Sequence, residues 1–342
     1  MNLAIQLIGI GCAFFVVFAL IGKTAVLVVS SIDRIGKQYR IPEFLLGFVI
    51  LGLATSTPEL FIGIQSSLTG IGQLSVGNIL GGIVLLLSLI AGIVSVVNGG
   101  IELKGLISRP ILLGVTFIFF TPLFLLLDSH LSRIDGGMLM AFYLFAVFLL
   151  AYESYRERDA SLVQKVWSVL IRRSVEPVPP DREAIEKKEE EKGLGYTYFL
   201  LGVGIVGLLI LSRIALELGL YTTQLFGFGA FVVGFLIFAL GTNLPELTIA
   251  LTSHKMKHEA LSLGNIVGSA VANIFVLGFV GVIRPIQFAA IDNLRAGMLF
   301  LVIAVTLFFF FSATGGRITR REGVVLIVLN VIFVAIQIFL SP

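Results

Sequence analysis

The sequence contains few charged residues, one cysteine and three histidines. Charged residues make up 13% of 342 residues, about half the share found in typical soluble domains. The single cysteine, Cys12, excludes an intramolecular disulfide and a cysteine-based metal site. The histidines His130, His254 and His258 lie at the ends of apolar stretches rather than in a catalytic cluster, and the chain has no Gly-x-x-x-x-Gly-Lys phosphate loop. His254 and His258 are four positions apart and could bind a metal, but we favour a solvated loop end for them. We therefore expect a protein that is not an enzyme and carries no cofactor.

Long apolar runs dominate the chain instead. Hydrophobic residues make up 57% of it, and the mean hydropathy is +1.03. About 20 apolar residues span a bilayer as a helix, and the runs lack the alternation of a membrane β-barrel, so we predict an all-α integral membrane protein. The ten predicted transmembrane helices cover residues 3–29, 42–68, 73–97, 108–127, 134–152, 196–220, 225–253, 259–283, 296–312 and 322–340.

A polar stretch divides these spans into two groups of five. It predicts a first repeat over 1–152, a cytoplasmic linker over 153–195 and a second repeat over 196–342. Of the 24 lysines and arginines, 19 fall on the linker's side of the membrane, which predicts that this side is cytoplasmic. Each half has an odd number of spans, so the second half enters the membrane in the opposite sense. The sequence thus predicts inverted repeats, an architecture that recurs in secondary transporters.

A short segment occurs twice, 187 positions apart. It reads Ala-Thr-Ser-Thr-Pro-Glu up to Glu59 and Gly-Thr-Asn-Leu-Pro-Glu up to Glu246, and Ser75–Asn78 and Ser262–Asn265 follow at the same interval. Inserting a glutamate at bilayer depth costs about 2.5–3.5 kcal/mol or more. Two glutamates at matching positions of a repeated unit therefore indicate function, and we interpret them as the centre of an ion site.

Each segment also places a proline inside its span. Proline has no amide hydrogen, so Pro58 leaves the carbonyl of Ala54 without its helical partner, and Pro245 does the same for Gly241. Neighbouring hydroxyls could satisfy such a bend. Next to a glutamate, however, a free carbonyl favours coordination of a cation.

Hydroxyl groups share a helix face with the carboxylates. Thr55 lies four positions before Glu59, and Thr242 lies four before Glu246. Carboxylate, hydroxyl and carbonyl oxygens are hard ligands, which suit Na⁺ or Ca²⁺ better than a soft transition metal. Two carboxylates would neutralise one Ca²⁺, and their mutual repulsion in an empty site would allow protons to compete.

A purely structural role for the glutamates would require a basic partner inside the membrane. The one arginine well inside a predicted span is Arg213, and Glu217 lies one turn away from it. We therefore favour the ion site over a structural ion pair.

The second helix of each copy adds polar residues unevenly. Ser269 and Asn273 are four apart and are expected to face the same site, whereas the matching positions of the first copy are Gly82 and Leu86. The site is therefore expected to be asymmetric.

The shared serines and asparagines have two interpretations. Ser75 and Ser262 have the character of helix caps. Asn78 and Asn265, which follow them, either satisfy helix ends or contribute to the site.

At these motifs the chain resembles the sodium/calcium exchanger family of cation/calcium antiporters, in a prokaryotic-type form with a divergent first repeat. The family signature is a repeated G-T-S-x-P-E followed downstream by G-N-x-x-G-S-N. The second copy, Gly241–Glu246 with Gly264–Ser269, is close to this pattern, and the first is partly eroded. The resemblance implies that spans 2, 3, 7 and 8 hold Na⁺ or Ca²⁺ alternately, while spans 1 and 6 slide to open opposite faces.

The resemblance, carried over by position, completes a candidate ligand set. Its members are Glu59, Glu246, Thr55, Thr242, Ala54, Gly241, Ser56, Asn243, Ser269 and Asn273. Asn243 replaces the family's serine in the second copy, Gly82 replaces another serine, and Leu86 replaces a polar residue. Fewer oxygens imply fewer sodium subsites.

The function expected from these observations is exchange of Ca²⁺ for Na⁺ by alternating access across a prokaryotic inner (plasma) membrane. The alternative is a proton-coupled exchanger for Ca²⁺ or another divalent cation. An ion channel is disfavoured because no repeated filter is present, and an inactive paralogue because both glutamates are retained. The expected partners are these ions and the lipid bilayer, with no nucleic acid and no protein partner.

Overall fold

The computed structural model describes residues 3–38, 48, 52–102, 109–149, 194–227, 229–255, 259–289 and 291–340. Within these ranges the chain is helical apart from two small two-stranded sheets. Seven helical segments are long and apolar enough to cross a membrane, and an eighth apolar helix, Gly114–Leu125, is shorter. The predicted linker and part of the predicted span 42–68 lie outside the described residues. The count of ten spans and the division at 153–195 therefore stay predictions.

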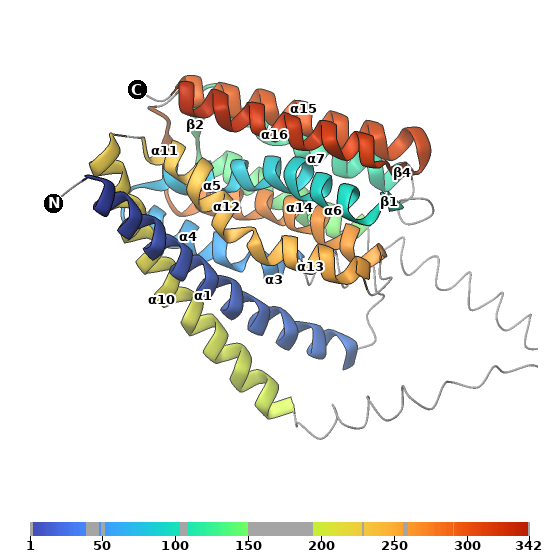
Figure 1. Cartoon of the computed structure of the whole chain (residues 1–342), viewed down its shortest axis with the longest axis horizontal. Coiled ribbons are helices and arrows are strands. Elements are labelled where there is room, and N and C mark those ends of the chain that lie inside the picture. Colours follow the sequence, from blue (N-terminus) through green and yellow to red (C-terminus); the bar gives the residue numbers. More distant parts are fainter. Residues whose placement is uncertain are drawn as a thin grey trace, which may run out of the picture.

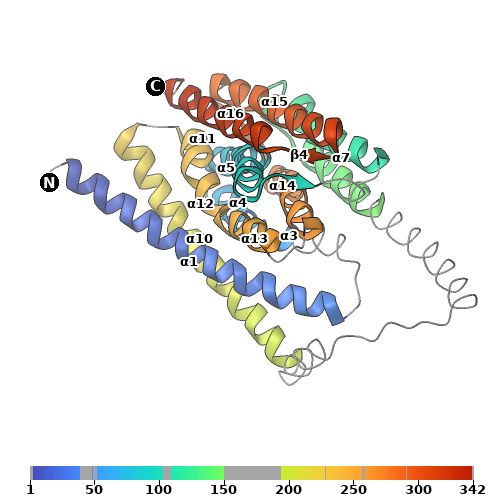
Figure 2. The ribbon, with the colours of Figure 1, turned by 45° about the vertical axis from the view of Figure 1, so that its right-hand side comes forward.

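The two longest helices form a pair at one side of the molecule. α1 (Leu3–Gln38) and α10 (Leu194–Phe226) lie side by side in both ribbon views (Figures 1 and 2). Both run past the predicted spans, which end at 29 and 220. Only 28% of the α10 span is buried inside the molecule, against 83% of Gly72–Asn98. The pair therefore lies at the edge of the fold.

The centre of the fold is built from two helices that are buried over most of their length. One is α5 (Gly72–Leu85), which continues through the π-helical turn η2 (Leu86–Ile90) into α6 (Ala91–Asn98). The other is α14 (Glu259–Ile283). Small and apolar residues fill both sequences, and a helix that is apolar all round is buried on every side.

The two segments that carry the repeated motif are broken helices. α3 (Gly52–Thr55) and α4 (Thr57–Leu68) meet at Ser56. In the second half, α11 (Ala230–Val233), the π turn η3 (Gly234–Phe238) and α12 (Ala239–Thr242) lead to Asn243, where α13 (Leu244–Lys255) begins. Each break lies two residues before the proline, as expected where an amide hydrogen is missing.

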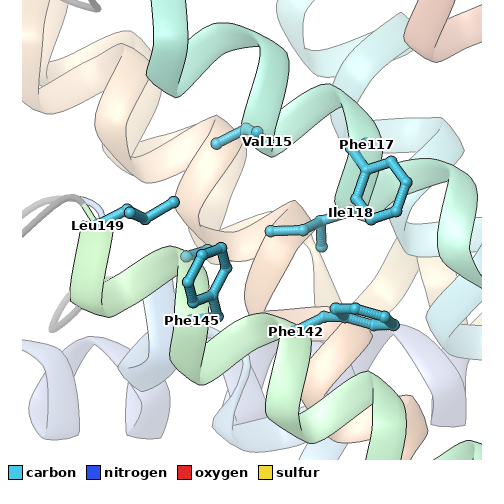
Figure 3. A pocket seen from close by; sticks show the side chains of 8 residues that line it. Val115, Phe117, Ile118, Phe142, Phe145 and Leu149 are labelled. Carbon is cyan, nitrogen blue, oxygen red and sulfur yellow. The ribbon is translucent and has the colours of Figure 1, made fainter.

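The remaining helices cover the far side of this centre. They are α7 (Arg109–Leu125), a helix over 133–149, α15 (Ile291–Gly315) and α16 (Arg320–Phe339). A groove between α7 and the helix over 133–149 is lined by apolar residues alone, including Phe117, Phe142 and Phe145 (Figure 3). It offers no polar atom to a cation.

The repeated sequence is matched by repeated contacts. A Cβ atom on Gly52 would lie 2.5 Å from the main-chain carbon of Gly268, and one on Gly81 would lie 3.0 Å from the Cβ of Ala239. Positions 52 and 239, and positions 81 and 268, are each 187 apart. Helices carrying matching positions therefore cross closely in both halves, at points where only small residues fit.

The two sheets follow nearly the same offset. β1 (Ile101–Glu102) pairs with β4 (Arg317–Ile318), and β2 (His130–Leu131) pairs with β3 (Ile286–Gln287), both antiparallel. β2 and β4 are 187 positions apart, whereas β1 and β3 are 185 apart, so the pairing recurs with a shift of two residues. The two sheets lie at opposite ends of the molecule in Figure 1.

Candidate cation site

The two repeated glutamates lie at equivalent places in the fold. Glu59 is in the first turn of α4 and Glu246 in the first turn of α13, directly after the helix breaks. Both side chains are buried, with exposed fractions of 0% and 1%, and the two carboxylates are close enough to repel each other. The amino end of a helix carries a partial positive charge, which favours a carboxylate there.

The carboxylate oxygens are largely unpartnered. Oε1 of Glu59 accepts one long hydrogen bond, of 3.5 Å, from Nδ2 of Asn243, while Oε2 has no partner. Neither oxygen of Glu246 has a partner. Buried charges in proteins are normally paired or bound to a cation, so these oxygens are open to a cation or to protons.

Neither glutamate meets a basic side chain in the part of the chain that the structure describes. The intramembrane arginine, Arg213, donates instead to Oε1 of Glu217 at 2.9 Å, and both side chains are exposed on α10. The structural ion pair considered as an alternative therefore finds no support.

A group of hydroxyls joins the first half of the chain to the second. Oγ1 of Thr55 lies 2.7 Å from Oγ of Ser269, and Oγ of Ser56 donates to the carbonyl of Ser269 at 3.3 Å. Thr55 also lies beside the carboxylate of Glu246, which belongs to the other half. Two adjacent residues of the first half thus meet two residues of the second half where α3 crosses α14.

The corresponding group in the second half is built differently. Oγ1 of Thr242 lies beside Glu59 and donates to Oδ1 of Asn78 at 3.2 Å. Nδ2 of Asn243 donates to the carbonyl of Ala239 at 2.8 Å, and its Oδ1 has no partner. Asn243 stands at the position that matches Ser56, so an amide replaces a hydroxyl at this place in the second half.

Three more buried asparagine side chains lie on the central helices α5 and α14. Asn273 and Asn265 are buried without a partner for either amide atom, and Asn78 has an unpartnered Nδ2. Our candidate set included Asn273 but left out Asn78 and Asn265. The repeated Ser-x-Gly-Asn piece was the signal that could have added them.

The expected capping role of the serines is wrong. α5 begins at Gly72 and α14 at Glu259, so Ser75 and Ser262 lie one turn inside their helices. The hydroxyl of Ser262 donates to the carbonyl of Ala250 at 3.0 Å and so ties α14 to α13.

The two carbonyl candidates lie at the breaks, in α3 for Ala54 and in α12 for Gly241. A Cβ on Gly241 would lie 2.4 Å from the ring of Phe18, and one on Gly22 would lie 3.8 Å from Pro245. α1 therefore covers the break of the second half directly.

The gathered groups offer oxygen and no soft ligand. No cluster of three or more histidine, cysteine, aspartate or glutamate residues occurs in the described ranges. Carboxylate, hydroxyl and amide oxygens suit Na⁺, Ca²⁺ or a proton, and they are poor ligands for a soft transition metal.

The fold and this polar centre define the class of protein: a helical, multi-pass membrane transporter in which broken helices meet at a buried site. The family model for the sodium/calcium exchanger protein matches residues 10–152 and 196–339. The chain belongs to the sodium/calcium exchanger family, and its antiporter homologues and membrane-spanning helices mark it as a membrane antiporter.

Individual relatives match over nearly the full length. The inner membrane protein YrbG of Escherichia coli is 24% identical, covering 92% of this chain and 95% of the relative. The sodium/calcium exchanger MaX1 of Methanosarcina acetivorans is 25% identical, covering 91% and 93%. A solved structure of the sodium-calcium exchanger NCX_Mj soaked with 10 mM Na⁺ has a TM-score of 0.62 at 22% identity, covering 95% of this chain and 98% of that one.

Proposed function

We propose that this protein exchanges Ca²⁺ for Na⁺ across the inner (plasma) membrane by alternating access, with its ions bound between Glu59 and Glu246. The observation that carries the proposal is the pair of buried carboxylates, three of whose four oxygens have no partner. A buried site with two negative charges attracts a divalent cation or two monovalent ones. The relative MaX1 is named as a sodium/calcium exchanger, which supports the same ions here.

The residues of the candidate set supply charge, neutral oxygens or positioning hydrogen bonds in this proposal. The carboxylates supply the charge, and the hydroxyls of Thr55, Thr242 and Ser269 supply neutral oxygens. The carbonyls of Ala54 and Gly241 are offered at the helix breaks, because Pro58 and Pro245 cannot donate to them. Ser56 and Asn243 position these groups through their hydrogen bonds to Ser269 and Glu59.

The two halves are proposed to be inverted repeats that bind the ions at their interface. The glycine crossings recur at an offset of 187 residues and the sheet pairing recurs within two residues of it, which supports this arrangement. α1 and α10 pack chiefly against each other, which suits two helices that move together past the broken segments.

A proton-coupled exchanger for Ca²⁺ or another divalent cation is the second candidate. It is favoured by the reduced oxygen set of the first half, where Gly82 and Leu86 stand at the positions that match Ser269 and Asn273. Two carboxylates could carry two protons without any further ligand.

The experiment that separates these candidates is uptake of ⁴⁵Ca²⁺ into proteoliposomes that contain the purified protein. An outward Na⁺ gradient is compared with an outward H⁺ gradient at a clamped membrane potential. Uptake driven by Na⁺ is expected, and uptake driven by H⁺ alone would establish the second candidate. Glu246→Gln should abolish uptake, whereas Glu322→Gln should not, because glutamine also serves in the capping box that Glu322 forms with Thr319.

A further inference from the structure

The buried centre holds two formal charges. Among the buried polar and charged side chains of the described residues, Glu59 and Glu246 are the two that ionise, and the rest are serine, threonine, asparagine and glutamine. A net charge is unfavourable in a low-dielectric interior. The occluded site is therefore neutral when it holds one divalent cation or two monovalent cations.

The side-chain amides of Asn243 and Asn273 lie beside Gly82, where a larger residue would supply a further charged or hydroxyl ligand. A Cβ on Gly82 would be 3.0 Å from Nδ2 of Asn243 and 3.1 Å from Nδ2 of Asn273. Both amides are buried, and their Oδ1 atoms have no partner. The two Nδ2 atoms therefore converge over Gly82, where they present amide donors and no negative charge.

The next position along the same helix offers no oxygen from its side chain. Leu86 is fully buried at the start of the π turn η2. Ser88, two residues further, donates its hydroxyl to Val84 and accepts from Nδ2 of Asn330 on α16, away from the glutamates. A third cation beside Gly82 and Leu86 would lack both a counter-charge and a set of side-chain oxygens.

We infer that the protein exchanges two monovalent cations for each divalent cation, so that transport is electroneutral, and that the neutral amide of Asn273 beside Gly82 fixes this ratio. The inference rests on the proposed function, since it concerns the coupling of that exchange.

The test is a measurement of the null point of exchange. Proteoliposomes containing the full chain receive a fixed tenfold Ca²⁺ gradient, and the Na⁺ gradient that stops net ⁴⁵Ca²⁺ flux is found at two membrane potentials set with K⁺ and valinomycin. If two Na⁺ exchange for one Ca²⁺, net flux stops at an about threefold Na⁺ gradient at both potentials. At that point the square of the Na⁺ concentration ratio equals the Ca²⁺ concentration ratio.

The outcomes of this test are distinct. A null point that moves with the potential, and lies at an about twofold gradient at zero potential, indicates three Na⁺ and overturns the inference while leaving the proposed function intact. If the pH gradient sets the null point instead, at an H⁺ concentration ratio whose square equals the Ca²⁺ concentration ratio, the inference holds with H⁺ in place of Na⁺. Absence of Ca²⁺ flux under both gradients removes the proposed function, and the inference with it.

A pair of matched variants tests the role of Asn273. Asn273→Asp adds a third carboxylate beside Gly82 and should make the null point depend on the potential. Asn330→Asp is the same chemical change at a buried amide of α16 outside the site, and it should keep the wild-type null point. A potential-independent null point for active Asn273→Asp would show that this residue does not set the ratio. If that variant is not folded, the wild-type null point alone decides the inference.

Discussion

The hydroxyl oxygens of Thr55 and Ser269 lie 2.7 Å apart, although 214 positions separate the two residues in the chain. The contact joins a broken helix of the first half to the continuous helix α14 of the second. Both residues belong to the candidate ligand set, so the site is shared by the two halves. A movement of one half relative to the other would change the set of oxygens that an ion meets.

The shared hydroxyl pair predicts coupled effects of substitution. Thr55→Val and Ser269→Ala should each raise the KM for Ca²⁺ by about tenfold, because each removes a hydrogen-bonding group worth about 1.5 kcal/mol. The double variant should lose much less than the product of the two effects, since the first substitution already breaks the bond. Ca²⁺ uptake over a concentration series measures these values. Fully multiplicative effects would show that the two hydroxyls act independently.

The two glutamates predict a binding signature that does not depend on transport. Ca²⁺ should raise the melting temperature of the wild-type protein in detergent, because a ligand that binds only the folded state stabilises it. Glu59→Gln and Glu246→Gln should abolish that rise, and Glu322→Gln should retain it. A normal Ca²⁺-dependent rise in either site variant would place the ion elsewhere.

The space over Gly82 predicts which substitutions can be combined. Gly82→Ser alone should impair Ca²⁺ uptake, since its Cβ would lie 3.0 Å from the amide of Asn243. Adding Asn243→Ser should restore uptake by removing that amide. With Leu86→Asn as a third change, the dependence on Na⁺ should become steeper, because oxygens are added. The Hill coefficient for Na⁺ measures this, and an unchanged coefficient would show that positions 82 and 86 do not line the site.

The close helix crossings predict a stability difference between glycines. Gly234→Ala would place a Cβ 1.9 Å from the carbonyl oxygen of Leu74, whereas Gly202→Ala meets nothing within 4 Å. We expect Gly234→Ala to destabilise the protein by about 1–3 kcal/mol or more. Gly202→Ala should be neutral or slightly stabilising, because alanine favours the helix. Thermal unfolding in detergent compares the two, and equal melting temperatures would contradict the observed crossing.

Much of this molecule follows from local sequence. The apolar runs predicted a helical membrane protein, and the described residues indeed include seven helical segments long and apolar enough to span a bilayer. The signature around Glu59 and Glu246 indicated the exchanger family, which the family match confirms. Helix ends were less accurate: α1 continues to Gln38 and α10 to Phe226, because polar residues extend a helix beyond the membrane without breaking it.

The sequence by itself determined the helices, the duplication and the two buried carboxylates, since each depends on composition, spacing or a proline within a few residues. Only the tertiary structure decided which groups meet: Thr55 with Ser269, Thr242 with Asn78, and both Asn243 and Asn273 over Gly82. These contacts depend on how closely two helices approach at residues such as Gly52 and Gly268. That approach is set by the packing of side chains far apart in the sequence, which no local pattern records.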